Sequence, residues 1–409
     1  MVGQGHRLLK VWRNVLILAL SQALALSCAV LAVTVGPLVG ASLAANPALA
    51  TLPVALTVVG ALLATVPASL LMRRLGRRAG FAIGALVGAS GGLFSAAGIH
   101  AGSFELFALG FLLIGAFQAF TAYFRFAAAE SVPEERKSRA IAWVLAGGVV
   151  AALLGPQMAL WGKDFVADRA FLGAFLLLSA FCVAIAALMP GLDLPRTERA
   201  AGVSSGRPLS VIARQPAFQV AVLGATVGYA VMLLVMTATP LAMVGHNHGV
   251  GDAVHVIQAH VLAMFAPSFF SGSLVRRFGA IEVLLAGLAL LAANALVAAS
   301  GVELAHFFAA LVLLGIGWNF TYVAGTALLT EAYVEEERAK TQAANELILQ
   351  GCVALASLAS GWVLAEFGWR VLALSALPPL AIAAVVAGRL LVSRREVGVP
   401  LASGGVPRG

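Results

Sequence analysis

Long apolar segments separated by short polar loops recur along the whole chain. Each segment is long enough to cross a bilayer as a helix, which takes about 18 or more mostly apolar residues. Because lipid offers the backbone no hydrogen-bond partners, such segments must be helices packed into a bundle. Together with charge clusters and glycine or proline breaks, the pattern predicts twelve spans, near residues 14–36, 51–71, 80–99, 104–126, 139–161, 169–189, 216–243, 253–275, 280–299, 304–330, 341–365 and 368–391.

A longer polar connection interrupts this pattern in the middle of the chain. It runs from about Pro190 to Gln215 and contains Arg196, Arg199, Arg207 and Arg214 with proline, glycine and serine. The sequence therefore predicts an all-α membrane protein with an N-terminal six-helix bundle (1–189), a cytoplasmic linker (190–215) and a C-terminal six-helix bundle (216–409).

Composition and charge add an orientation to this picture. Hydrophobic residues make up 61% of the chain and charged residues only 11%, which excludes an ordinary soluble protein. Nearly all of the 26 lysines and arginines fall in the termini, the linker and alternate loops. Cytoplasmic loops carry such an excess, so we expect a multi-pass membrane protein with both termini cytoplasmic. The basic charge then reflects topology and contact with the lipid bilayer, without a nucleic-acid partner.

An internal repeat supports two related halves. Arg73-Arg74-Leu75-Gly76 follows the second span, and Arg276-Arg277-Phe278-Gly279 follows the eighth. These residues resemble the loop motif of the major facilitator superfamily, although arginine replaces its acidic residue at Arg73 and Arg276. The resemblance implies twelve helices in two pseudo-symmetric six-helix halves, with substrate bound near the midplane and alternating access as the halves rock.

Methionine and histidine gather in one part of the apolar sequence. Met232 and Met236 are four residues apart on one face of the seventh span, and His260 and Met264 have the same spacing in the eighth. In an antiparallel hairpin the four side chains would lie at similar depth. Three thioethers and one imidazole favour Cu(I) over harder metals. His246, His248 and His255 near the loop between the two spans are candidates for capturing copper first.

The same four residues resemble those of the CcoA-like copper importers, a branch of the superfamily. The resemblance implies import of copper, as substrate and without a cofactor, across the bacterial cytoplasmic membrane. It also implies support of cbb-type cytochrome oxidase assembly, and periplasmic or cytoplasmic copper chaperones are candidate partners. Metal roles carry over only to Met232, Met236, His260 and Met264.

Other polar residues within the spans or at their ends are candidates for gating or for lining the cavity. Glu130 and Glu331 could pair with the loop arginines, including Arg73 and Arg276, when the inner gate is shut. Charge inside a span is costly and suggests a role in coupling or gating. The charged candidates are Arg125 and Glu346. The uncharged polar residues that could line the cavity with them are Gln118, Gln157, Asn319 and Asn345.

Two other functions remain open from the sequence. One is a proton-coupled exporter of small organic compounds, in which the methionines form a flexible apolar wall; the lack of acidic residues in 14–99 speaks against it. The other is a membrane metal sensor that does not transport. The chain has no catalytic metal motif and no phosphate-binding loop, so we expect no enzyme. Cys28, Cys182 and Cys352 predict buried thiols without a disulfide framework.

Overall fold

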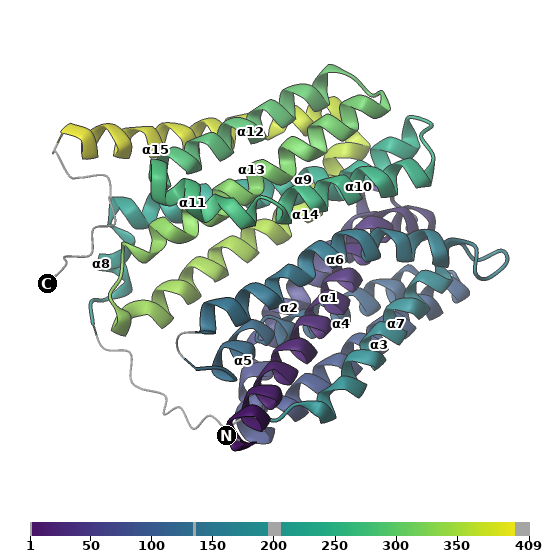
Figure 1. Ribbon diagram of the computed structural model, residues 1–409. Helices are drawn as coiled ribbons and strands as arrows, with labels where there is room; N and C mark the ends of the chain where they lie inside the picture. Colours follow the sequence, from purple (N-terminus) through teal and green to yellow (C-terminus); the bar gives the residue numbers. More distant parts are fainter. Residues whose placement is uncertain (1, 134–135, 195–205, 397–409) are drawn as a thin grey trace, which may run out of the picture. The chain divides into compact units, whose positions relative to one another are not determined.

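The chain folds into helices that form two compact units. The computed structural model (Figure 1) describes residues 2–133, 136–194 and 206–396, and these contain no strand. One unit comprises Met1–Ala200 with Gly249–Gln258, and the other comprises Ala201–His248 with Ala259–Gly409. The predicted all-α membrane fold is confirmed. Arg196 and Arg199 of the predicted linker lie outside the described residues.

The first unit is built around α1, α3 and α4. Helix α1 packs along α6, α2 packs along α4, and α3 packs against both α4 and α7. Fully buried phenylalanines, among them Phe107, Phe111 and Phe175, fill its core. Its elements are α1 (Val2–Leu43), η1 (Pro47–Leu49), α2 (Leu52–Leu75), α3 (Arg77–Ala101), α4 (Phe104–Thr121), α5 (Phe124–Glu130), α6 (Lys137–Lys163), α7 (Leu172–Leu188) and η3 (Met189–Gly191).

The second unit repeats this plan. Helix α9 packs against α13 and α14, and α12 runs beside α13 (Figure 1). The first part of α10, up to Gln258, groups with the first unit. The elements are α8 (Leu209–Ala213), α9 (Pro216–Gly245), α10 (Val250–Phe265), α11 (Ser268–Phe278), α12 (Ala280–Ser300), α13 (Leu304–Thr330), η4 (Glu335–Glu337), α14 (Arg338–Ser375) and α15 (Leu377–Glu396).

Two breaks explain how these helices give twelve spans. Within the described residues, ten helices are long and apolar enough to cross a membrane on their own, and α10 with α11 forms an eleventh span bent by 43°. The last of the ten, Lys340–Glu396, has 57 residues. At about 1.5 Å per residue it is far longer than the roughly 30 Å hydrocarbon core. It is interrupted at Gly368, where φ is 77° and ψ 176°, and therefore counts as two spans.

The repeated Arg-Arg-x-Gly sequence is also a structural repeat. Gly76 separates α2 from α3 with φ 84° and ψ 159°, and Gly279 separates α11 from α12 with φ 102° and ψ 151°. This backbone region is essentially accessible to glycine alone. The two glycines therefore make the same sharp turn in the two units, which explains why the motif occurs twice.

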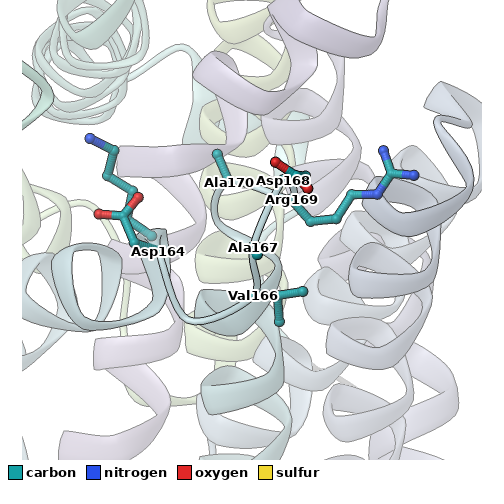
Figure 2. A pocket seen from close by; sticks show the side chains of 7 residues that line it. Asp164, Val166, Ala167, Asp168, Arg169 and Ala170 are labelled. Atoms are coloured by element: carbon teal, nitrogen blue, oxygen red, sulfur yellow. The ribbon is translucent and has the colours of Figure 1, made fainter.

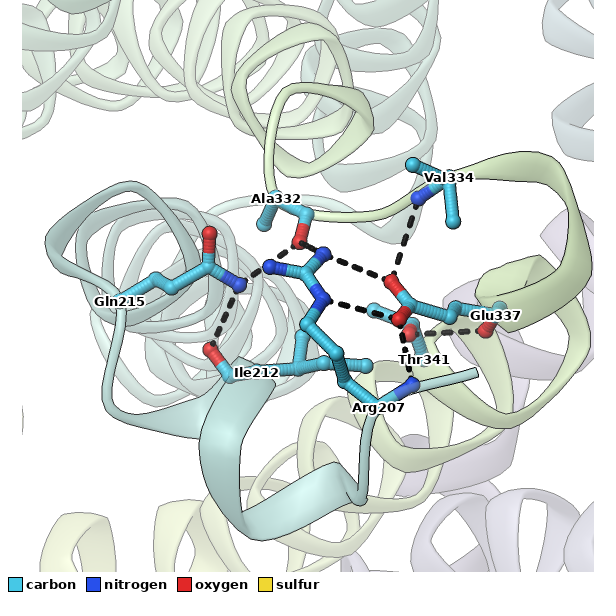
Figure 3. Close-up of polar contacts among 7 residues, drawn as sticks. All are labelled: Arg207, Ile212, Gln215, Ala332, Val334, Glu337 and Thr341. Atoms are coloured by element: carbon cyan, nitrogen blue, oxygen red, sulfur yellow. Dashed lines mark hydrogen bonds and ion pairs between the residues drawn. The ribbon is translucent and has the colours of Figure 1, made fainter. Parts of the chain in front are cut away.

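The end of the linker is held in the second unit by an ion pair whose carboxylate is buried. Arg207 donates from its backbone N and from Nε to Glu337 Oε1, at 2.7 and 2.8 Å, and from Nη2 to Oε2 at 2.7 Å (Figure 3). The Glu337 side chain is only 1% exposed. Gln215 donates to the Ala332 carbonyl beside this pair. These bonds hold the start of α8 against η4.

This ion pair predicts a specific pH dependence of stability. Hydrogen bonds from the Arg207 side chain lower the pKa of Glu337 from 4.5 to about 2. A lowered pKa in the folded state means that the carboxylate stabilises the fold above its ordinary pKa, and that this contribution is lost as pH falls toward 2. Glu337→Gln should therefore melt several degrees below wild type near neutral pH, and the difference should shrink between about pH 4.5 and pH 2 in detergent.

The neighbouring Glu336 offers a matched control, because it is exposed and one residue away. Glu336→Gln should melt like wild type across this range. A Glu337→Gln difference that stays constant from neutral pH down to about pH 2 would contradict the assignment of the ion pair as the stabilising group.

Candidate functional site

Four aromatic side chains from three helices of the second unit meet near the middle of the spans. Tyr229 lies on α9, Phe265 on α10, and Trp318 and Tyr322 on α13. The Trp318 and Tyr322 rings are stacked, with centroids 5.2 Å apart and planes 11° apart. The Tyr229 centroid lies 5.5 Å from Trp318 and 6.1 Å from Tyr322, and Phe265 lies 6.4 Å from Trp318. We call these four residues the aromatic cluster.

Local sequence explains why the aromatic cluster forms. Trp318 and Tyr322 are four residues apart and therefore share one face of α13. Helix α9 comes close to this face because Gly228 has no side chain: a Cβ at that position would lie 2.2 Å from the Thr321 Oγ1. The adjacent Tyr229 is thereby placed against the stacked pair.

Buried polar atoms without partners accompany the cluster. The Trp318 side chain is 9% exposed and its Nε1 donor has no partner among the described residues. Asn319 is 2% exposed, and its Oδ1 acceptor likewise has none. A buried polar group normally finds a hydrogen bond. Trp318 of the cluster therefore has a donor without a partner, and the adjacent Asn319 has an acceptor without one.

The break between α10 and α11 lies next to these atoms. Pro267, which has no N–H, follows the end of α10 and interrupts the helical hydrogen bonds. Asn319 Nδ2 donates to the Met264 carbonyl at 2.8 Å and to the Ser268 Oγ at 2.7 Å. The side chain thus bridges the break, as a helix interrupted within lipid requires.

A carboxylate lies within electrostatic range of the cluster. Glu346 on α14 lies close enough to Tyr229 for its charge to act on the hydroxyl. Glu346, a gating candidate from the sequence, therefore lies close to the aromatic cluster, which was not among the predicted site residues.

The predicted metal ligands are buried in the second unit. Met232, Met236 and Met264 are 2%, 5% and 7% exposed, and His260 is 0% exposed. The His260 Nδ1 donates to the Leu311 carbonyl at 2.8 Å, and Nε2 has no partner among the described residues. The described chain contains no group of three or more His, Cys, Asp and Glu side chains arranged for a metal ion. The ligand role of these four residues stays a prediction.

The histidines predicted to capture copper are in part engaged elsewhere. His246 Nδ1 donates to the Ala242 carbonyl at 2.7 Å, which closes the end of α9. His248 Nε2 donates to the Val302 carbonyl at 2.7 Å, and its ring lies edge-on to Phe307. His255 is exposed on α10. A capture role for them stays a prediction.

The charged gating candidates form pairs within each unit. Glu130 accepts from Arg77, the arginine after Gly76, at 2.7 Å. Glu331 is 2.8 Å from Arg394 on α15. Glu331 therefore pairs with a helix that follows it in the chain, and a gating role for either acidic residue stays a prediction.

The arginines predicted to take part in gating are all exposed. Arg276 donates to the Ser273 Oγ at 2.8 Å on its own helix. Arg125 stacks over the Phe126 ring, 4.8 Å from its centroid. Arg73 is exposed at the end of α2. A gating role for these three arginines stays a prediction.

The three cysteines differ in burial, and one loop of the described chain carries a shallow hollow. Cys28 and Cys182 are buried, as predicted, whereas Cys352 is exposed, so the prediction of burial is wrong for that residue. A shallow hollow at the α6–α7 connection (Figure 2) is formed by the loop itself and contains none of the predicted site residues; it is lined by Lys163, Asp164, Val166, Ala167, Asp168, Arg169 and Ala170.

The chain is a membrane transporter. The chain belongs to the Major Facilitator Superfamily, whose family model matches residues 15–292 and 223–407. It is similar to the riboflavin transporter RfnT of Brucella anthropi, with 43% identity over 360 residues that cover 88% of this chain and 90% of the relative. It is also 30% identical to the uncharacterized MFS-type transporter YddS of Bacillus subtilis, over 84% of this chain and 83% of the relative.

Solved structures agree with this fold. Two crystal structures of a bacterial homologue of the human lysosomal transporter Spinster, both inward-facing, match at 17% identity. The occupied form has a TM-score of 0.70 and covers 93% of this chain and 96% of that chain. The unoccupied form has a TM-score of 0.72, with coverage of 97% and 99%.

The prediction of copper import is wrong. A relative at 43% identity over most of both chains is a riboflavin transporter and not a copper importer. The predictions that depend on copper import are therefore also wrong: copper as substrate, copper chaperones as partners and the link to oxidase assembly. The prediction rested on four residues, Met232, Met236, His260 and Met264, whereas the relative matches along the whole bundle. The prediction that the chain is a transporter and no enzyme is confirmed.

Proposed function

We propose that this protein is a secondary transporter of riboflavin. The observation that carries the proposal is the 43% identity to a riboflavin transporter over 88% of the chain. This substrate agrees with the alternative drawn from the sequence, a small organic compound, and replaces the metal ion. In that alternative the compound is exported with proton coupling, and the lack of acidic residues in 14–99 speaks against it; the proposal takes over only the class of substrate.

The aromatic cluster suits such a substrate. Ligand sites for small organic molecules are mostly apolar and aromatic, with a few polar groups that fix orientation. Trp318 and Asn319 add an indole donor and an amide acceptor to the rings, and both atoms are without partners among the described residues. Riboflavin is uncharged near neutral pH and carries a flat ring system with hydrogen-bonding edges. The chemistry of the cluster supports an uncharged planar substrate better than an ion.

The location proposed for this activity is the bacterial cytoplasmic membrane. The excess of arginine in the linker, including Arg207 and Arg214, supports placing the linker and both termini in the cytoplasm. Riboflavin would then cross by alternating access of the two six-helix halves.

Uptake by cells tests the proposal. A bacterial strain that can neither synthesise nor import riboflavin should grow at low external riboflavin when it expresses this protein, and should accumulate labelled riboflavin. An excess of unlabelled riboflavin should suppress the accumulation, whereas an excess of thiamine should not. Accumulation equal to that of the empty-vector strain, with the protein present in the membrane, would overturn the proposal.

A further inference from the structure

We propose that the aromatic cluster is the binding site for the isoalloxazine ring of riboflavin. The proposal rests on the proposed function and adds to it the residues that recognise the substrate. It assigns ring stacking to Trp318 and Tyr322, and hydrogen bonding to Trp318 Nε1 and Asn319 Oδ1.

The geometry of the rings provides a stacking surface. Trp318 and Tyr322 lie with their planes 11° apart, whereas Tyr229 is inclined by 60° to Trp318 and Phe265 by 72°. Parallel rings stack on a flat π system, and inclined rings contact its edge. Tyr229, Phe265 and Tyr322 are all partly exposed, in the middle or inner part of apolar spans. A planar tricyclic ligand can therefore stack on the pair while the inclined rings flank it.

The free polar atoms match the edge of this ring. The pyrimidine-like end of isoalloxazine presents carbonyl oxygens, which accept hydrogen bonds, beside an imide N–H, which donates. Trp318 Nε1 can only donate, and Asn319 Oδ1 can only accept. The Asn319 amide is fixed in this orientation, because its Nδ2 already donates to Met264 and Ser268.

Packing between helices holds the site rigid. Gly315, one turn before Trp318 and Asn319, allows α10 to approach α13, since a Cβ there would lie 2.6 Å from the His260 carbonyl oxygen. His260 reinforces the contact through its bond to Leu311. His260 and Met264 therefore act on this site as positioning residues, which gives the conspicuous methionine and histidine pair a role without a metal.

Binding to the purified full-length protein tests the proposal. Stacked indole and phenol rings quench flavin fluorescence, so wild type should quench bound riboflavin. Trp318→Leu, which removes the ring, should raise the Kd for riboflavin roughly tenfold and relieve quenching, as loss of one stacking ring does elsewhere. Trp318→Phe, which keeps a ring and removes the donor, should raise Kd by a smaller factor. Trp362→Leu is the matched control, because Trp362 is 52% exposed on α14. This variant should bind riboflavin with the wild-type Kd.

Competition separates ring recognition from recognition of the sugar-like chain. Lumiflavin, which keeps the isoalloxazine ring, should displace riboflavin from wild type, and ribitol should not. Folding of each variant is checked by its helical circular dichroism. If Trp318→Leu does not fold, the Kd of Trp318→Phe and the displacement of riboflavin by lumiflavin test the proposed site.

The binding results distinguish failure of the proposed site from failure of the proposed function. Wild-type Kd and quenching in the folded Trp318 variants, or displacement by ribitol and not by lumiflavin, would overturn this site and leave riboflavin transport standing. Wild-type protein that binds no riboflavin would overturn the proposed function and the site together.

Discussion

Gly315→Val is expected to remove most riboflavin transport and to lower the stability of the second unit. A Cβ at Gly315 would lie 2.6 Å from the His260 carbonyl oxygen and 2.9 Å from the Met264 backbone nitrogen. Both are backbone atoms of a packed helix, so α10 must move away from α13. Overpacking of this kind costs about 1–3 kcal/mol, and valine adds two methyl groups to the clash. Transport rate and melting temperature in detergent measure the effect.

Gly351 provides the matched control for this substitution. It lies within α14, and a Cβ there would meet nothing within 4 Å. Gly351→Val should therefore transport and melt nearly as wild type does. Equal behaviour of the two valine variants would mean that the close contact between α10 and α13 does not matter for function.

Asn319→Leu is expected to destabilise the protein even without substrate. The leucine side chain has a similar size but donates no hydrogen bond, so the Met264 carbonyl at the helix break loses the donor at 2.8 Å. Interhelical hydrogen bonds in membranes contribute about 0.6–2 kcal/mol, and an unsatisfied buried acceptor costs about 1–3 kcal/mol. The melting temperature of Asn319→Leu should fall by several degrees.

Ser268→Ala gives a graded comparison, because it removes only one of the two acceptors of Asn319. Its melting temperature should fall by much less than that of Asn319→Leu, since the Met264 carbonyl keeps its donor. A larger loss for Ser268→Ala would show that the hydroxyl, and not the amide bridge to Met264, holds the break.

Much of the fold could be predicted because lipid makes span length and apolarity decisive. The Arg-Arg-x-Gly repeat indicated two related halves, and the structure shows the same glycine turn at Gly76 and Gly279. The break at Gly368 coincides with the first residue of the last predicted span, 368–391. The pairing of Glu331 with Arg394 could not be predicted, because a sequence does not show which helix ends meet across a bundle.

The site was harder to predict, for a physical reason. Clustering of methionine and histidine in one stretch is visible in a sequence, whereas the aromatic cluster joins three helices that are far apart in the chain. A readable signal existed in α13, where Trp318 and Tyr322 share a helix face beside Asn319, which the sequence did mark as lining a cavity. Four residues that resemble a metal site carried less information about the substrate than similarity along the whole chain.

Riboflavin counterflow in liposomes tests the central claim most directly. Vesicles that contain the purified protein and a high internal concentration of unlabelled riboflavin are diluted into labelled riboflavin. Because exchange through a transporter needs no added driving ion, the account predicts a transient accumulation of label above that of protein-free vesicles, and a much smaller one for Trp318→Leu. Folded wild-type protein that accumulates no more label than protein-free vesicles would contradict the account.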